Sequence, residues 1–203
     1  LINYSLTVFD NDLSGNTELA IQNFDTSSVG TIETVDASGN WFGTTDESTI
    51  DVMVDGAVDF TPYLATGTDT SIAAGFQGDF STLYVTALGE QTTTDGRITQ
   101  AVNLNSSTTG TIIINDGTYT EDVTIGDSMT LTGTGIIDGT LSLLDNAKLV
   151  PGSSPGTLEV DQLIASDSNQ TLFVEINGTT PGTEHDQLVV NGPVTLNGMT
   201  LDV

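Results

Sequence analysis

Residues 111–133 read TIIINDGTYTEDVTIGDSMTLTG, and this stretch decides the fold class. Apolar and polar residues alternate in short runs, at 111–114 and 123–125, with the two-residue period of half-buried strands. Between these runs, residues 115–117 (Asn-Asp-Gly) tolerate the positive φ of a sharp turn. The stretch therefore predicts short strands that are separated by tight turns.

The same pattern continues on both sides of this stretch. Further short alternating runs occur at residues 5–9, 157–160, 172–176, 188–190, 194–196 and 199–201. Turn signals such as Pro151-Gly152 separate them, and helix-forming residues at helical spacing are rare. We therefore expect an all-β protein.

The pattern leaves two arrangements of the strands open. Strand spacing drifts, the strands are short, and Thr, Ser and Asn line their faces, which favours a parallel β-helix (β-solenoid). The Asn-Gly steps at residues 177–178, 191–192 and 197–198 could equally close antiparallel hairpins. A β-sandwich therefore stays open for the C-terminal part.

One segment departs from the strand pattern. Within residues 95–104, Ile98, Ala101 and Val102 share one helical face, which predicts a short helix that caps a solenoid end. Residues 65–81 are rich in Gly, Thr and Ala and are interpreted as a linker. This divides the chain into units 1–64 and 82–203.

The charge balance limits the partners of this protein. The 203 residues include 28 Asp and Glu but only 2 Lys and Arg, giving a net charge of -26. Such a chain has no basic patch for nucleic acid, and no apolar run is long enough for membrane insertion. There is no Cys for a disulfide or a thiolate zinc site. Because Leu1 is not Met and no leader follows it, we expect a processed piece.

Three stretches resemble secreted bacterial proteins. Residues 40–45 (NWFGTT) and 56–64 (GAVDFTPYL) resemble the ending after the last coil of secreted right-handed parallel β-helix proteins. Residues 96–133 resemble the opening of such a β-helix, with its capping helix. Residues 148–190, with PGSSPGTL and HDQLVV, resemble repeats of autotransporter-like bacterial surface exoproteins.

The resemblance implies an extracellular, cell-surface protein with a right-handed parallel β-helix. It implies that residues 1–64 are the C-terminal coils and end plug of one β-helix, and that 82–203 begin another. The end plug is expected to consist of Trp41, Phe42, Phe60 and Tyr63. Phe42 and Tyr63 stand where these proteins usually have Trp.

No catalytic residue is predicted, and the chain is not expected to be an enzyme. Lyases of this fold are expected, by resemblance, to need basic residues near an acidic sugar, and only Arg97 and Lys148 are available. The single histidine, His185, has no recognisable nucleophile partner. A polysaccharide lyase or hydrolase is therefore the least favoured function.

Calcium is the one cofactor that the sequence suggests. Oxygen ligands suit Ca²⁺, although no complete calcium-binding loop is present. The candidate ligands form two groups, Asp10, Asp12 and Asn16, and Asp116, Glu121 and Asp122.

Asparagines have two predicted roles. Asn16, Asn23, Asn40, Asn115 and Asn197 lie at turns, where their amides are expected to bond to backbone groups. Candidate glycosylation sites, each beginning an Asn-x-Ser/Thr sequence, are Asn3, Asn105, Asn169 and Asn177.

The function expected from these features is structural. Neither end of the chain has a capping pattern, so we expect copies to stack end to end, or flanking segments of the same parent protein to continue the rod. The protein would be a cell-surface filament subunit or a segment of a giant exoprotein. An adhesin stalk or a module that binds surface glycans is the alternative.

Overall fold

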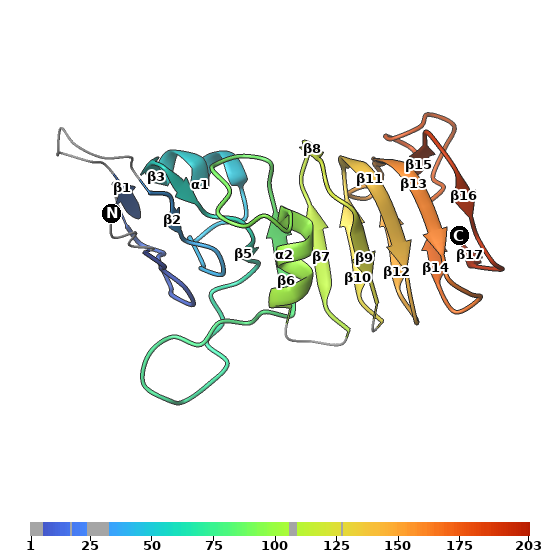
Figure 1. Cartoon of the computed structure of the whole chain (residues 1–203). Coiled ribbons are helices and arrows are strands. Elements are labelled where there is room, and N and C mark those ends of the chain that lie inside the picture. Colours follow the sequence, from blue (N-terminus) through green and yellow to red (C-terminus); the bar gives the residue numbers. More distant parts are fainter. Residues whose placement is uncertain (1–5, 17, 24–32, 106–108, 127) are drawn as a thin grey trace.

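The structure is a computed structural model that describes residues 6–16, 18–23, 33–105, 109–126 and 128–203. The described chain is mostly β-strand with two short helices, which confirms the all-β prediction. Figure 1 shows the strands following one another along an elongated molecule.

The first part of the chain has five short strands and a helix. They are β1 (Ile21–Asn23), β2 (Val35–Asp36), α1 (Glu47–Met53), β3 (Val54–Gly56), β4 (Val58–Asp59) and β5 (Tyr63–Leu64). β1 pairs with β3, and β2 pairs with β4, both in parallel.

Helix α1 was not predicted, so the expectation of a single helix was wrong. Its sequence contains the β-branched residues Thr49, Ile50 and Val52, which are typical of strands. The helix forms because the carboxylate of Asp46 accepts hydrogen bonds from the backbone N–H groups of Ser48 and Thr49, and because Ile50 is fully buried.

The rest of the chain alternates between two sheets. Its elements are β6 (Thr82–Val85), α2 (Arg97–Leu104), β7 (Thr111–Ile114), β8 (Thr118–Tyr119), β9 (Val123–Ile125), β10 (Thr130–Gly133), β11 (Gly135–Leu143), β12 (Lys148–Pro151), β13 (Thr157–Ala165), β14 (Thr171–Phe173), β15 (Gln187–Val190), β16 (Val194–Thr195) and β17 (Thr200–Asp202). One sheet has the order β17-β14-β12-β10-β7-β6-β5, and the other has the order β15-β13-β11-β8. β9 also pairs with β11, and β16 with β13.

Strands β6 to β17 pair with one another only in parallel. The Asn-Gly steps after β15 and before β17 therefore do not close hairpins between these strands, and the pairings do not support the β-sandwich alternative. Each return of the chain to a sheet adds a strand beside the previous one.

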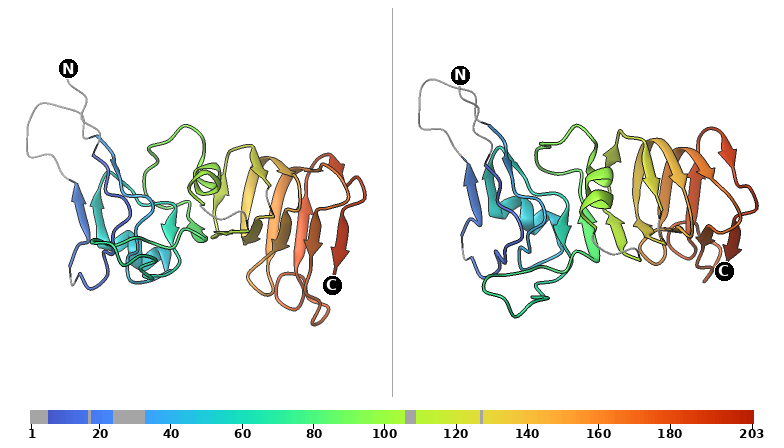
Figure 2. Two further views of the ribbon diagram at one scale, coloured as in Figure 1. Left: turned by 90° about the horizontal axis from the view of Figure 1, so that it is seen from below. Right: turned by 60° about the horizontal axis from the view of Figure 1, so that its bottom comes forward.

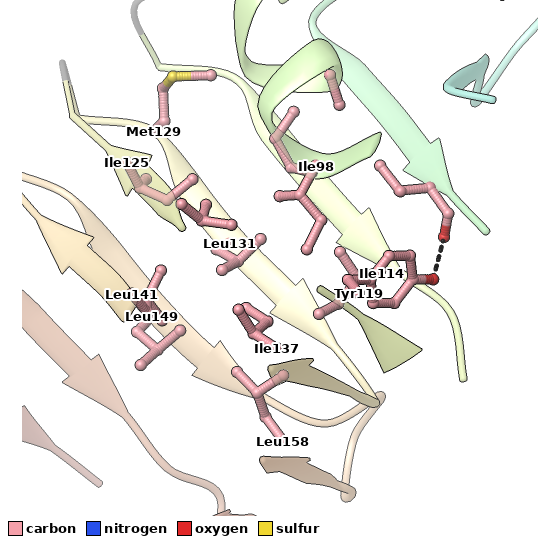
Figure 3. Close-up of a cluster of buried hydrophobic side chains, with 14 of the residues drawn as sticks. Ile98, Ile114, Tyr119, Ile125, Met129, Leu131, Ile137, Leu141, Leu149 and Leu158 are labelled. Carbon is pink, nitrogen blue, oxygen red and sulfur yellow. Dashed lines mark hydrogen bonds between the residues drawn. The ribbon is translucent and has the colours of Figure 1, made fainter. Parts of the chain in front are cut away.

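The parallel register stacks like residues above one another in the core. One such column runs through Leu83, Ile112, Leu131, Leu149, Leu172 and Leu201. Figure 3 shows part of the core that this column joins, including Leu131, Ile137 and Leu149. The buried phenol of Tyr119 donates a hydrogen bond to the carbonyl of Val85, drawn there as a dashed line.

Helix α2 lies within the predicted range 95–104. It packs against β6, β7 and β9, with Ile98 and Ala101 fully buried in the main core. Val102 is only partly buried against the same core. The helix therefore covers apolar side chains at the start of the two-sheet stack.

Residues 65–81 connect two neighbouring strands. β5 and β6 pair antiparallel and belong to the same sheet. Figure 1 and the right-hand view of Figure 2 show the connection as a loop that leaves the stack of strands and returns to it. The division into units 1–64 and 82–203 stays a prediction.

Candidate functional site

Three of the four aromatic residues predicted as an end plug share one buried cluster. Phe42, Phe60 and Tyr63 are buried, and the ring of Phe60 lies 6.3 Å from each of the other two. Tyr63 also stacks on Tyr84 of β6, with ring centroids 5.6 Å apart. Trp41 is partly buried against the main core. The four residues thus divide between two hydrophobic clusters, and Tyr63 contacts the next part of the chain through Tyr84.

Burial and hydrogen bonds explain the chemistry of Tyr63. Its hydroxyl donates to the carbonyl of Thr45 and accepts from the amide of Asn115. Burial raises the pKa of Tyr63 well above its usual value, and the nearby carboxylate of Glu47 adds to this rise. The phenol therefore stays protonated and acts as a structural hydrogen-bonding group.

A polar cleft lies where the loop before α2 meets the turn around β8. Its volume is about 590 Å³. Its lining consists of Gln91, Thr93, Thr94, Asp95, Gly96, Arg97 and residues 118–122. This cleft contains Glu121 and Asp122, two of the predicted calcium ligands, whereas Asp116 lines a different hollow.

Arg97 fixes one wall of the cleft. Its guanidinium donates four hydrogen bonds to backbone carbonyls, those of Thr86 (3.2 Å), Leu88 (2.7 Å), Gly89 (2.7 Å) and Glu90 (3.0 Å). Five donors in a rigid fork suit this clustered set of acceptors. Arg97 therefore holds the loop in place, and its charge is already engaged by protein groups.

Asp59 also holds the loop before α2 in place, through Thr92. It is fully buried, and its Oδ2 accepts hydrogen bonds from the backbone N–H (2.6 Å) and hydroxyl (2.8 Å) of Thr92. Burial raises the pKa of Asp59 above its usual 3.8, although these hydrogen bonds and the charge of Arg97 oppose the rise.

Glu121 also lines the cleft, and it caps α2. The helix begins after Gly96, which has no side chain to cap it. The carboxylate of Glu121 replaces that cap, accepting the backbone N–H groups of Ile98 and Thr99, both at 2.9 Å. A carboxylate at a helix N-terminus is also favoured by the helix dipole.

Four of the other predicted calcium ligands also accept or donate hydrogen bonds. Asp10 accepts the N–H of Gly78, Asp12 that of Ser14, and Asp122 that of Thr140. The Asn16 amide donates to the carbonyl of Leu13. In the part of the chain that the structure describes, no group of three or more His, Asp or Glu side chains could hold a metal ion. Calcium binding stays a prediction from the sequence.

The predicted turn asparagines behave mostly as expected. Side-chain amides of Asn16, Asn23, Asn40 and Asn197 donate to backbone carbonyls, which confirms their structural role. Asn115 instead donates to two side chains, the carboxylate of Glu47 and the hydroxyl of Tyr63.

Of the four glycosylation candidates, Asn3 lies outside the described residues. Asn169 and Asn177 are exposed. The side chain of Asn105 is half-buried and donates to the carbonyl of Ser81 at 3.2 Å. Glycosylation stays a prediction at all four.

The two remaining positions considered for catalysis have local contacts. Lys148 lies 4.4 Å above the ring of Phe173, and His185 Nδ1 is 3.2 Å from the carbonyl oxygen of Gly178. The absence of catalysis stays a prediction.

Sequence reasoning missed Asp186, a buried carboxylate in the HDQLVV motif. Its Oδ1 accepts the N–H of Gly156 and its Oδ2 accepts the N–H of Glu175, both at 2.9 Å. Asp186 therefore links the PGSSPGTL turn to the segment that follows β14. The sequence did contain a signal for this contact, namely that Pro-Gly and Asp-Gln-Leu occur together in one motif. The Pro-Gly part supplies Gly156 and the Asp-Gln-Leu part supplies Asp186.

Comparison of the chain with protein-family models, with curated proteins and with solved structures gave no match. Neither helix in the described ranges has the length and apolar character needed to cross a membrane.

Proposed function

We propose that this chain is a right-handed parallel β-helix that serves as an extracellular structural protein, a subunit of a cell-surface filament. The parallel register of β6 to β17 and the alternation of the chain between two sheets support a solenoid. The strong acid excess and the resemblance to surface exoproteins support an extracellular location.

One observation supports the structural role most directly. The column of core side chains from Leu83 to Leu201 is buried along most of its length but exposed to solvent on the last strand. Leu131 and Leu149 are fully buried, Leu172 is partly buried, and Leu201 on the last strand is 63% exposed. A second column of the other sheet ends in the same way, from Leu163 (1% exposed) to Val194 (49%). Leu201 and Val194, which continue buried columns of the core, thus form an exposed apolar surface on the last strands, which we call the end face.

That end face also has open backbone groups. β17 pairs with β14 and with no other strand of the described chain. Thr200 donates its N–H to Gln170, on the β14 side, so the N–H of the next residue, Leu201, points to the open edge. Such an edge is a template for strand addition. A further parallel coil would cover the apolar side chains of the end face and would also form hydrogen bonds with the open backbone groups of β17.

A second copy of the chain is the occupant that we propose for this end face. Unlike ends that meet by a rotation that does not close give a filament. The other source of a further coil is a flanking segment of the same parent protein, as in a giant exoprotein. Both sources use the same end face.

The test is negative-stain electron microscopy of the purified chain at moderate salt, compared with the variant Leu201→Asp. Filaments with a subunit-length repeat are expected for the parent chain and not for Leu201→Asp. Val52→Asp is the matched control, because it adds the same charge at an exposed position of α1 (72% exposed). Single rods of the parent chain at all concentrations would overturn self-assembly and leave flanking segments as the occupant.

A glycan-binding stalk is the second candidate, and the outer face of the seven-stranded sheet favours it. One row of this face consists of Thr82, Thr111, Thr130, Lys148, Thr171 and Thr200. The neighbouring row includes Tyr84, Ile113, Thr132 and Val150. Acidic side chains are absent from both rows until Asp202 on β17, whereas Asp138, Glu159 and Asp161 lie on strands of the other sheet or next to them.

Hydroxyl groups beside aromatic and aliphatic side chains suit a neutral polysaccharide. The face is about 25 Å long at the usual strand spacing, and only two side chains wide, which is narrow for a stable dimer interface. Retention of the chain on insoluble neutral polysaccharides tests this candidate. Ile113→Glu should abolish retention, and Ile164→Glu, on the other sheet, should not.

A further inference from the structure

Three Asn-Gly steps occur in the sequence, at residues 177–178, 191–192 and 197–198. An Asn-Gly step is prone to a spontaneous reaction, because glycine has no side chain to obstruct attack by its backbone nitrogen on the preceding Asn side chain. The reaction needs both groups to be free to approach each other. Their surroundings differ among the three steps.

Two of the steps have a restrained side-chain amide. Asn191 donates from Nδ2 to Oε1 of Glu159 at 2.7 Å. Asn197 donates from Nδ2 to the carbonyls of Ala165 (2.9 Å) and Ser166 (3.3 Å), and its φ of 44° places it in the left-handed region. These bonds restrain each side-chain amide, and the reaction would have to break them.

At the third step, neither the side-chain amide of the asparagine nor the N–H of the glycine is restrained by a hydrogen bond within the described part of the chain. Asn177 is exposed, and its side-chain amide has no hydrogen-bond partner among the described residues. The N–H of Gly178 likewise has none within the described ranges. The groups around this pair are bonded, since Asn177 N–H donates to Glu184 and the next two backbone N–H groups donate to the Glu184 carboxylate. No hydrogen bond among the described residues thus restrains the attacking nitrogen or the attacked side-chain amide.

We propose that Asn177 is a site of spontaneous deamidation and isoaspartate formation, and that it reacts before the other two Asn-Gly steps. The nitrogen of Gly178 forms a bond to Cγ of Asn177, and the Cγ–Nδ2 bond breaks. The proton lost from Gly178 leaves with Nδ2 as ammonia, which gives a cyclic succinimide. Water then opens the ring at either carbonyl, giving aspartate or isoaspartate, with no oxidant or reductant.

The product changes a turn that is part of the stack. Isoaspartate inserts a methylene group into the main chain between residues 177 and 178, in the segment that joins Glu175 to Asp186. Either product adds a negative charge near Glu175 and Glu184. The reaction uses the amide nitrogen that a glycan would occupy, so glycosylation of Asn177 would prevent it.

The experiment is incubation of the full folded chain in mildly alkaline buffer, followed by peptide mass mapping and isoaspartate detection over time. Conversion at Asn177 is expected several-fold faster than at Asn191 and Asn197. In denaturant the three steps should convert at similar rates, because the hydrogen bonds that distinguish them are lost. Equal rates in the folded chain, or faster reaction at Asn191 or Asn197, would overturn the proposal.

A variant tests the physical reason. Glu159→Thr removes the acceptor of the Asn191 amide while keeping a residue suited to a strand, so conversion at Asn191 should rise several-fold and conversion at Asn177 should not change. Asn177→Gln removes the Asn-Gly step at residues 177–178 and serves as the negative control for the peptide that contains it. Unchanged conversion at Asn191 in a variant with the parent circular dichroism spectrum would contradict the assigned protection.

Discussion

Buried polar side chains fix the turns of this chain by bonding to backbone groups that would otherwise be unpaired. Asn40 donates to the carbonyls of Val8 and Ala37, and Gln170 donates to that of Asp145. Both side chains are fully buried. Leaving a buried donor or acceptor unsatisfied costs about 1–3 kcal/mol, so these residues contribute strongly to the stability of their turns.

Asp186→Ala is expected to lower the free energy of unfolding by about 2–5 kcal/mol, because it leaves the N–H groups of Gly156 and Glu175 without their acceptor. Urea denaturation measures the change. The control Asp161→Ala removes an exposed carboxylate and should change stability by less than about 0.5 kcal/mol. Equal effects of the two variants would contradict the role of Asp186.

Asp59 gives the chain a specific pH dependence. Burial raises its pKa in the folded state above the unfolded value, so the folded protein binds this proton more tightly. The contribution to stability is therefore full below pH 3.8 and is lost as the pH rises through the folded pKa. The stability of the parent chain relative to Asp59→Asn should fall as the pH rises from 3.8, measured by urea denaturation. A difference that does not change with pH would be inconsistent with this shift.

At the scale of elements, β7, β9, β10 and β13 to β17 were predicted, whereas the other strands and helix α1 were not. The run predicted at residues 5–9 forms no strand in its described part, where Thr7 makes only an isolated bridge to Asp36. The alternation in residues 111–133 predicts β7, β9 and β10, because a half-buried strand needs it. The β-branched residues of α1 predict a strand, and burial of Ile50 with the Asp46 cap outweighs that preference. Most of the partners of buried polar groups could not be predicted, since pairs such as Asp59 and Thr92 are 33 residues apart and no sequence motif joins them.

Glu121→Ala is expected to destabilise the start of α2. It removes the acceptor of two backbone N–H groups at the helix N-terminus, a loss of about 0.5–2 kcal/mol. Hydrogen exchange of the amides of Ile98 and Thr99 should accelerate in the variant. Glu90→Ala, at an exposed loop position, should leave that exchange unchanged. If Glu121→Ala does not alter exchange at α2, the cap does not act as described.

At the scale of the molecule, two opposing features govern association. The apolar end face around Leu201 and Val194 favours the addition of a further coil, whereas a net charge of -26 makes copies repel one another. Salt screens this repulsion, with a Debye length of about 10 Å at 0.1 M. End-to-end association should thus strengthen as the salt concentration rises.

Sedimentation velocity over a series of sodium chloride concentrations checks this balance. The weight-average sedimentation coefficient of the parent chain is expected to increase with salt, and that of Leu201→Asp is expected to stay at the monomer value. Leu201→Asp keeps the acidic surface of the parent chain. Comparing the two chains therefore distinguishes association through the end face from non-specific association at high salt. A parallel increase in both chains would rule out the end face as the site of association.

The most direct test of the open end is hydrogen exchange of the Leu201 amide, followed by NMR in dilute and in concentrated samples of the parent chain. The N–H of Thr200 is bonded within the chain and serves as the internal reference. Strand addition predicts that Leu201 exchanges rapidly when dilute and becomes protected when the chain associates. An associated sample in which the Leu201 amide still exchanges rapidly would contradict the account, because the new coil would not be pairing with β17.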